Sequence, residues 1–596
     1  MCGIFGYSGN ENASKKILNG LKRLEYRGYD SWGIAVSSSK DNLQKNFINI
    51  IKKIGPIGDV DIDSKGFEKY SIGIGHTRWA THGGVTEKNA HPHLSTDSSF
   101  GLAQNGIVEN YQELKSDLIQ KGYKFISETD TEVIVRLIEE KLKTSNDLKI
   151  ATREAFLDLK GRNTIIILDS INDRIIAVRN GSPLVVGVGE NETIIASDTL
   201  SFSDLTDKII LIENNEMIEC IDSKIKIYDL QNNNEVEYVI QTLENADVEV
   251  NKEGFDHFML KEIVEQRFTI KESIQYTDNE LENFIKEIRN SKKVYTIGAG
   301  TAGFAAMQIA YFLRKYARID AIELKSYEID SYKNLFTKDD IIIAVSQSGE
   351  TADTIEAIEL AKSKGTKVAS IVNMLGSTIT RLSDYKFFTR SGPEICVAST
   401  KAFTAQISWG LLLAFSLNTK SQELKILISE LSEKLMDFFN EETFENIKNL
   451  VEKIHTKEHF FVLGKGQNNV IALEGALKIK EITYKHFEGF PAGELKHGVI
   501  ALIEKGTPVI GIISNDEYKN DMLSAMAEVK SRGAFTIGIA NENNDLFDYF
   551  IPVIDGKEAD SIVNVIPFQL ISYFMALKLG NTPDRPRNLA KSVTVK

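Results

Sequence analysis

The sequence predicts a multi-domain protein in which a layered α+β domain precedes two α/β domains with parallel sheets. Its 596 residues exceed what a single hydrophobic core normally serves. Short apolar strands and glycine-containing loops dominate the first ~240 residues, whereas strand, glycine-rich turn and helix alternate after them. The second part also repeats itself, which predicts two domains of one kind.

The first part of the chain is predicted to form sheets that pack in layers and are covered by a few helices. Residues 33–36, 71–75 and 164–169 are short apolar runs typical of strands. A helix is expected after Thr129, because Thr129 and Glu132 have the spacing of a capping box and apolar residues follow at helical spacing. Many strands with few helices favour a layered arrangement.

The second part is predicted to be a tandem duplication. Polar stretches at 231–235 and 244–254 mark its start. Three pairs of similar runs lie 166 to 168 residues apart: 294–300 with 460–466, 340–346 with 508–514, and 367–373 with 535–541. The predicted boundaries are 1–240 for the layered domain, 250–422 and 423–582 for the two copies, and 583–596 for a C-terminal tail.

Composition and charge argue against several classes of protein. The net charge of −14 argues against a nucleic-acid partner, which normally requires a basic domain or stripe. The three cysteines lie far apart, which excludes a disulfide framework and fits a reduced cytoplasmic setting. The first residues do not read as a signal peptide, and no apolar run approaches the ~18 residues of a membrane span, so no membrane partner is expected.

Cys2 is a candidate nucleophile. Removal of Met1 would leave Cys2 with a thiol and a free α-amine on one residue. The amine, whose pKa is roughly 7.7–8.0, can act as a base at neutral pH, as in N-terminal nucleophile enzymes. The alternative is an incidental cysteine after the start codon, and on Cys2 alone this alternative is the better one.

Five motifs in the first ~130 residues reverse that judgement, because weak motifs in a fixed order are jointly specific. They are 2–7, 23–31, 76–83, 105–106 and 128–132. Together they resemble the class II glutamine amidotransferase domain, which begins with a catalytic cysteine. The resemblance implies an Ntn-hydrolase-like fold and L-glutamine as a substrate.

The resemblance assigns roles that the chemistry of glutamine explains. Arg78 matches the residue that binds the carboxylate of glutamine, and Asp130 matches the residue that binds its ammonium group. Asn105 and the N–H group of Gly106 match the donors to the oxyanion formed by thiolate attack. Further matches in the motif around Arg78 are Thr81 and His82 as substrate-binding residues and Trp79 as a channel gate.

A group of four histidines does not predict a metal site. His76, His82, His91 and His93 lie close together in the sequence, but their spacing fits no common zinc motif. Loop scaffolding is the expected role, and no metal is expected.

A glycine pattern at 298–303 has the spacing of a dinucleotide fingerprint, with Asp320 and Glu323 at about the right distance for a ribose. The second copy lacks the pattern, and glycines at a strand-to-helix turn permit the binding of any phosphate. An NAD-binding oxidoreductase is therefore the weaker alternative, and no cofactor is expected.

A cluster of hydroxyl groups follows the apolar strand 341–345 and precedes a helix expected at 354–362. Hydroxyls and backbone N–H groups at a helix N-terminus suit a phosphate monoester, whereas an N-cap cluster would explain only one of the hydroxyls. This run and 397–401 resemble the sugar isomerase (SIS) domain. The expected phosphate ligands are Ser346, Gln347, Ser348, Thr351 and Ser399.

A helix is expected at 471–486, with Lys478 and Glu481 on one face; a solvated ion pair is the plain alternative for them. The runs 492–498 and 586–595 follow. From Cys2 to the last residues, the motifs resemble the isomerising glutamine–fructose-6-phosphate aminotransferase family.

This resemblance implies that ammonia crosses an internal channel to fructose 6-phosphate or a related ketose phosphate, which becomes an amino-sugar phosphate. His497 matches the residue that opens the sugar ring, and Glu481 the base that moves a proton between C1 and C2. Lys591, in the tail, matches a Schiff-base lysine, and Lys478 a substrate-binding residue. The resemblance also implies a homodimer without metal or redox cofactor.

The sequence departs from this family in several places. The first phosphate loop of the family usually reads G-C-G-T-S, but Ala299 and Ala302 stand here, which removes a hydroxyl worth about 1 kcal/mol. Residues 326–330 replace an E-F-R-Y-R run, Gln104 stands where histidine is common, and Trp32 where alanine is usual. These changes leave open a paralogous amidotransferase for a different ketose phosphate.

Overall fold

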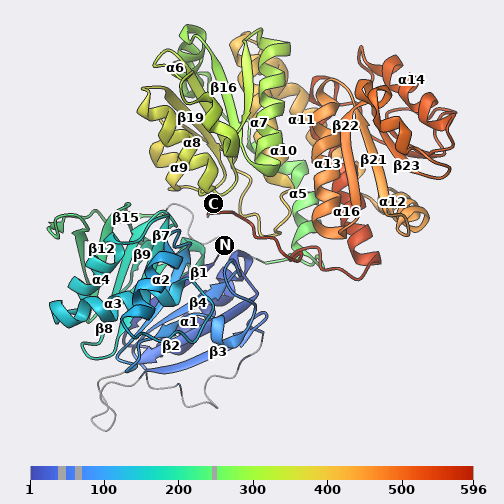
Figure 1. The fold of residues 1–596 in the computed structure, drawn as a ribbon. Helices are drawn as coiled ribbons and strands as arrows, with labels where there is room; N and C mark the ends of the chain where they lie inside the picture. Colours follow the sequence, from blue (N-terminus) through green and yellow to red (C-terminus); the bar gives the residue numbers. More distant parts are fainter. Residues whose placement is uncertain are drawn as a thin grey trace. The chain divides into compact units, whose positions relative to one another are not determined.

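The computed structural model of the protein describes residues 2–37, 48–58, 60, 67, 70–243 and 251–594. The chain divides into two compact units. The first comprises Met1–Glu249 with Ser592–Lys596, and the second comprises Val250–Lys591 (Figure 1). Each unit has its own sheets and hydrophobic clusters.

The first unit contains two antiparallel sheets. The described strands of the larger sheet are, in spatial order, β15 (Gln241–Thr242), β11 (Lys208–Leu211), β9 (Val185–Val188), β10 (Glu192–Ala196), β1 (Gly3–Gly9), β4 (Ile72–Arg78), β2 (Ser31–Ser37) and β3 (Asn49–Ile54). Those of the smaller sheet are β14 (Glu235–Val236), β13 (Lys224–Asp229), β12 (Glu216–Ile221), β8 (Arg174–Asn180), β7 (Asn163–Asp169), β6 (Phe100–Gly106) and β5 (His93–Leu94).

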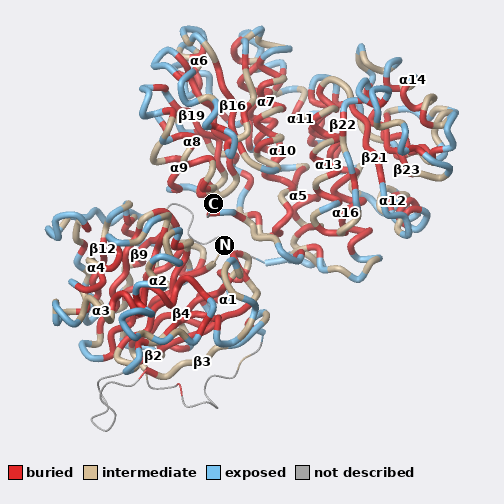
Figure 2. Tube along the Cα trace, viewed as in Figure 1, coloured by how far each residue is buried: buried red, intermediate tan, exposed pale blue. Residues whose placement is uncertain are grey.

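The two sheets face each other between layers of helices. Ile4 packs between the sheets, whereas its neighbour Phe5 packs on the outer face of the larger sheet, as the two-residue period of a strand requires. The central strands of the two sheets, among them β1, β4 and β7, are buried, whereas edge strands such as β3 are more exposed (Figure 2). The helices are α1 (Ala13–Leu24) on the larger sheet, and α2 (Tyr111–Gln120), α3 (Thr131–Ser145) and α4 (Leu148–Leu157) on the smaller. The layered α+β prediction is confirmed.

The predicted capping box before α3 is wrong. The hydroxyl of Thr129 bonds the Nε2 atom of buried His93 at 3.0 Å, and the Glu132 carboxylate accepts the N–H group of Ser127 at 2.6 Å. Both side chains are therefore engaged by the loop that precedes the helix. The N-cap of α3 is Asp130, which makes no side-chain capping bond.

The second unit contains two parallel sheets of the same topology. One has the order β17 (Ala321–Lys325), β16 (Val294–Gly298), β18 (Ile341–Ser346), β19 (Lys367–Val372) and β20 (Tyr385–Phe388). The other has the order β22 (His486–Pro491), β21 (His459–Gly464), β23 (Pro508–Ile513), β24 (Phe535–Ala540) and β25 (Tyr549–Pro552). The shared order confirms the predicted duplication.

Helices pack on both faces of these sheets, and the two copies share one continuous hydrophobic cluster. The helices of the first copy are α5 (Phe258–Glu272), α6 (Asp278–Asn290), α7 (Gly300–Phe312), α8 (Ala352–Ser363), α9 (Thr378–Leu382) and α10 (Lys401–Leu417). Those that follow are α11 (Ser421–Phe438), α12 (Glu441–Ile454), α13 (Gln467–Thr483), α14 (Lys519–Lys530), α15 (Asp560–Asn564) and α16 (Ile566–Lys578).

Helix α13 ends at Thr483 rather than at His486 as predicted. Tyr484 adopts a left-handed conformation with φ of 62°, which terminates the helix, and its N–H group bonds the carbonyl of Lys480 at 3.2 Å. His486 instead begins strand β22.

One segment, Lys557–Lys578, is long and apolar enough to cross a membrane by length and composition alone. Its mean hydropathy is 1.3, but 89% of its most apolar window is buried inside the fold. A helix that is apolar all round and covered by its own protein is a core helix.

Candidate active sites

Cys2 lies directly before β1, in the middle of the larger sheet of the first unit. The N–H group of Trp79 points at its Sγ atom at 3.3 Å. Its carbonyl oxygen accepts bonds from Asn105 Nδ2 at 3.2 Å and Arg27 Nε at 3.4 Å. Burial raises the pKa of the thiol, and the Trp79 N–H group and the Arg78 guanidinium act in the opposite direction. Cys2 is thus fixed at a strand end among hydrogen-bond donors.

Two candidate oxyanion donors end strand β6, beside Cys2. Asn105 Nδ2 bonds the Cys2 carbonyl and also Ser197 Oγ at 2.9 Å. The Asn105 Oδ1 atom lies 3.1 Å from His76 Nε2, so the amide is held with its nitrogen toward Cys2. Gly106 has φ of 124°, and a Cβ atom there would lie 2.2 Å from the Arg162 carbonyl oxygen, so no larger residue fits.

The candidate glutamine ligands lie in the same unit. The Arg78 guanidinium donates to the carbonyls of His82 at 2.5 Å, Gly83 at 3.1 Å and Gly84 at 3.2 Å. Asp130 accepts the N–H group of Val108 at 2.8 Å, and burial raises its pKa. Arg78 and Asp130 influence each other electrostatically. His82 and Trp79 are half-buried, and Thr81 is exposed.

Three of the four histidines form a buried row beside Asn105. The ring centroids of His76 and His91 lie 4.3 Å apart, and those of His91 and His93 5.0 Å apart. Burial lowers the pKa of His76 to about 3 and holds those of His91 and His93 well below their usual value, so all three are neutral. Gln104 joins this network through its backbone, because its carbonyl oxygen lies 2.9 Å from His76 Nε2 and its N–H group donates to His91 Nδ1 at 3.4 Å. Among the described residues no group of three His, Cys, Asp or Glu side chains is arranged to hold a metal ion.

The hydroxyl cluster of the second unit forms the turn between β18 and α8. Ser346 Oγ accepts the N–H group of Gly349 at 2.9 Å and lies 3.3 Å from Thr351 Oγ1. Ser348 Oγ accepts the N–H group of Glu350 at 3.1 Å. The turn stands where β16 and β18 lead to helices on opposite faces, which is where open parallel sheets bind ligands.

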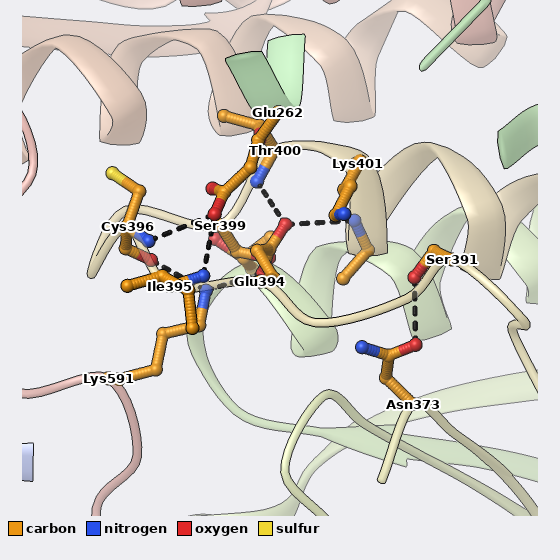
Figure 3. Close-up of polar contacts among 12 residues, drawn as sticks. Glu262, Asn373, Ser391, Glu394, Ile395, Cys396, Ser399, Thr400, Lys401 and Lys591 are labelled. Atoms are coloured by element: carbon orange, nitrogen blue, oxygen red, sulfur yellow. Dashed lines mark hydrogen bonds and ion pairs between the residues drawn. The ribbon is translucent and has the colours of Figure 1, made fainter. Parts of the chain in front are cut away.

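A backbone bond and two side-chain bonds connect this turn to a second polar cluster. The N–H group of Asn373 donates to the Gln347 carbonyl at 3.1 Å. Its side chain accepts a bond from Ser391 at 2.8 Å and donates to the Gly392 carbonyl at 2.8 Å (Figure 3).

The centre of the second cluster is the buried carboxylate of Glu394, which the sequence did not single out (Figure 3). It accepts bonds from the Thr400 N–H group at 2.9 Å, Ser399 Oγ at 2.8 Å and the Lys591 ammonium. Lys591 also donates to the Cys396 carbonyl at 2.7 Å. Although burial opposes it, the Lys591 ammonium holds the pKa of Glu394 below its usual value.

Glu262 is a second carboxyl group that the sequence did not reveal. It accepts the N–H groups of Ile395 at 2.6 Å and Cys396 at 3.2 Å. Burial, and then the charge of Glu394, raise its pKa to about 8. Glu262 is therefore protonated at neutral pH, and Glu394 is the anion that faces Lys591. The one sequence signal was that Glu394 lies shortly before the motif 397–401.

A third polar cluster lies on α13. Lys478 Nζ is 2.6 Å from Glu481 and 3.5 Å from Glu474, which in turn accepts the hydroxyl of Thr301 at 3.2 Å. Burial raises the pKa of Glu474 to about 8. Although burial opposes it, Glu474 and Glu481 raise the pKa of Lys478, and Glu394 adds to this effect. The charge of Glu394 therefore acts on the cluster around Lys478.

The structure does not bring His497 beside Glu481. His497 is exposed and ends a short helix whose Leu495 packs with α14 and with Phe461 on one face of the second sheet. Helix α13, which carries Glu481, packs with Phe460 on the opposite face. Alternate strand residues point to opposite faces, so the sheet separates His497 from Glu481 within one chain.

Comparison with known proteins agrees with this arrangement of two sites. Residues 76–204 match a model described as a glutamine amidotransferase domain, and residues 287–416 and 453–579 each match the SIS domain. Relatives named glutamine–fructose-6-phosphate aminotransferase (isomerizing) are 39% identical in Pyrococcus horikoshii and 40% identical in Clostridium tetani, and each alignment covers 100% of both chains. The chain belongs to the isomerising glutamine–fructose-6-phosphate aminotransferase family.

A solved structure of this family resembles the second unit. It is the C-terminal domain of glucosamine–fructose-6-phosphate aminotransferase from Francisella tularensis, with 32% identity and a TM-score of 0.51. The match covers 56% of this chain and 100% of that one.

The dinucleotide fingerprint has the expected local setting but lacks an acidic residue for a ribose. Gly298 ends β16 and Gly300 begins α7, as the fingerprint requires. Asp320 precedes β17, and Glu323 lies inside it and pairs with Arg314 at 2.8 Å. Ligands of such sheets bind beyond the carboxyl ends of the strands, and there β17 ends in Lys325. This is the turn of an SIS domain rather than a dinucleotide site.

Proposed function

We propose that this protein transfers the amide nitrogen of L-glutamine to fructose 6-phosphate and isomerises the product to glucosamine 6-phosphate. The observation that carries the proposal is the pairing, in one chain of this family, of the Cys2 site with the lysine and carboxylate clusters beside the hydroxyl turn. The reaction needs no redox cofactor, because the amination and the isomerisation together oxidise nothing.

In the first unit, we infer that the α-amine of Cys2, once Met1 is removed, takes the thiol proton. The thiolate attacks the glutamine amide, and Asn105 with the N–H group of Gly106 stabilises the oxyanion. The intermediate then expels ammonia, which takes a proton from the α-ammonium group of Cys2, and a thioester remains. Arg78 and Asp130 hold the carboxylate and ammonium groups of glutamine. Water then releases glutamate from the thioester. Trp79 remains the predicted gate for ammonia.

In the second unit, the turn Ser346–Thr351 and Ser399 bind the sugar phosphate. Lys591 gives a proton to Glu394, and its amine condenses with the C2 carbonyl to a Schiff base with release of water. Ammonia then adds at C2 and displaces the Lys591 amine, which leaves an imine at C2. Glu481, held by Lys478, then moves a proton between C1 and C2. Glu394 stabilises the Lys591 ammonium before the reaction.

The separation of His497 from Glu481 supports a homodimer. If both residues act on one sugar, His497 must come from a second chain. Mixing Glu481→Gln chains with His497→Asn chains tests this, because mixed dimers would regain one intact site. Without recovery in verified mixed dimers, the shared site is excluded.

The principal test is mass spectrometry of products from glutamine with fructose 6-phosphate and with other ketose phosphates. Glucosamine 6-phosphate as the main product supports the proposal. A better ketose phosphate would establish the paralogous amidotransferase, the alternative favoured by Ala302. Cys2→Ala should abolish synthesis from glutamine while leaving sugar isomerisation measurable.

A further inference from the structure

Lys325 ends β17, with its ammonium beside the first turn of α7, and the residue after it contacts the first turn of α8. It is the last residue of β17 and lies opposite Gly298 of β16 in the sheet register. The hydroxyl of the next residue, Ser326, accepts a bond from Thr354, in the first turn of α8, at 3.2 Å. The Lys325 ammonium lies 3.7 Å from where a Cβ atom would stand on Gly303, in the first turn of α7.

The Lys325 ammonium forms no ion pair in the described part of the chain, although the charge of Glu323 acts on it and opposes the effect of burial on its pKa. Among the described residues, no carboxylate lies within ion-pair distance of this ammonium. The ammonium instead makes a cation–π contact with Phe304, at 4.8 Å from the centroid of the ring. The nearby carboxylate of Glu323 is already paired with Arg314. Burial lowers the pKa of Lys325, which shows that its ammonium is partly desolvated. A half-buried cation without a partner is a site that an anion would stabilise.

The first turn of α7 lacks a free side-chain donor for a phosphate. Ala299 and Ala302 carry no hydroxyl, and the hydroxyl of Thr301 donates to Glu474 at 3.2 Å. Backbone N–H groups at this helix start remain available for an anion. A lysine from the neighbouring strand would supply the side-chain donor that this turn does not.

We propose that Lys325 binds the phosphate group of the ketose phosphate, opposite the hydroxyls of Ser346–Thr351. The inference rests on the proposed function, because it places the substrate at that turn. An ammonium group is a compact charge that suits a phosphate dianion and replaces a neutral hydroxyl donor by a charged one.

Steady-state kinetics of Lys325→Met with fructose 6-phosphate tests the proposal. Loss of one charged hydrogen bond should raise KM roughly ten- to hundredfold and leave kcat within about twofold. Competitive inhibition by inorganic phosphate should weaken by a similar factor. Lys325→Arg should retain most of the affinity, and Lys333→Met, which removes an exposed lysine beyond the same strand, should behave like the unchanged protein.

Two results would overturn the proposal: an unchanged KM and phosphate inhibition in Lys325→Met, or a loss of kcat and thermal stability that Lys325→Arg does not restore. The second would show that Lys325 only supports the fold. If the unchanged protein makes no amino sugar, the proposed function fails first. Calorimetric binding of inorganic phosphate to the unchanged and Lys325→Met proteins would still decide the role of Lys325.

Discussion

The two copies of the α/β domain have the same strand order but differ at one equivalent turn, which follows β18 in the first copy and β23 in the second. The difference lies in the hydrogen-bond partners of the side chains in that turn. In the first copy, the turn after β18 carries the hydroxyls of Ser346, Ser348 and Thr351, and the first two accept N–H groups of the turn itself. In the second, the Ser514 hydroxyl accepts bonds from the side-chain amides of Asn468 at 2.8 Å and Asn564 at 3.1 Å. The acidic residues at 516–517 follow it. Duplication supplied two scaffolds: the first carries the proposed phosphate turn, and the second fills the equivalent place with its own side chains.

The second copy contributes charged side chains through α13, the helix that follows its first strand, β21. Helix α13 carries Glu474, Lys478 and Glu481, whereas the corresponding helix α7 of the first copy carries no charged residue. The hydrogen bond from Thr301 to Glu474 joins the two helices. The comparison thus supports the proposal that the first copy binds the phosphate and the second transfers the proton.

The largest expected effect is on proton transfer in the second copy. Glu481→Gln removes the base, so kcat for amino-sugar formation should fall roughly 10²–10⁴-fold. Glutamine hydrolysis should continue, since Cys2 lies in the other unit. Glu488→Gln is the matched control, because Glu488 is exposed on β22. Equal losses in both variants would contradict the assignment of the base.

A smaller effect is expected on phosphate binding, and only in the first copy. Replacing Ser348 and Thr351 by alanine should raise KM for the sugar roughly ten- to hundredfold, because hydrogen bonds to a charged group are lost. Ser514→Ala, at the equivalent place in the second copy, should leave KM unchanged. It should instead lower the free energy of unfolding by about 1–3 kcal/mol, because Asn468 and Asn564 lose their acceptor.

Those two variants are measured by steady-state kinetics and by denaturant unfolding. A raised sugar KM in Ser514→Ala would show that both copies bind phosphate. An unchanged KM in the double variant would place the phosphate elsewhere.

The smallest expected effect is on the pH dependence of stability, through the side chain of Glu474. Its pKa in the fold is about 8, above its ordinary value of 4.5, so between these pH values the folded protein holds a proton that the unfolded chain releases. The stability from this group is complete below about pH 4.5 and declines as pH rises through 8. Glu474→Gln should flatten the decline by at most about 1.4 kcal/mol per pH unit, the limit for one proton. Unfolding measured at pH 5.5, 6.5 and 7.5 would show an unchanged slope if Glu474 is already ionised.

The order and type of the elements were predictable because they depend on local patterns. The apolar run 164–169 became β7, and the glycine pattern at 298–303 became a strand-to-helix turn, as periodicity and glycine placement indicated. Where prediction failed, a distant partner decided the result. Thr129 bonds His93 rather than capping α3, because the fold brings a buried imidazole to it.

The candidate sites were predictable only as far as motifs reach. Cys2, Asn105 and Glu481 were found because each lies in a recognisable run, and their roles remain predictions. Glu394 and Glu262 were missed, because nothing in the sequence shows that they meet Lys591 and Cys396 across the fold. The separation of His497 from Glu481 likewise depends on which face of a sheet each element covers.

The transfer of nitrogen between the two substrates is the central claim. Glutamine labelled with ¹⁵N at the amide should be incubated with fructose 6-phosphate and excess unlabelled ammonium, and the sugar product analysed by mass spectrometry. We expect glucosamine 6-phosphate that carries ¹⁵N at its amino group, and none from Cys2→Ala. Release of labelled ammonium and glutamate without labelled amino sugar would contradict the account.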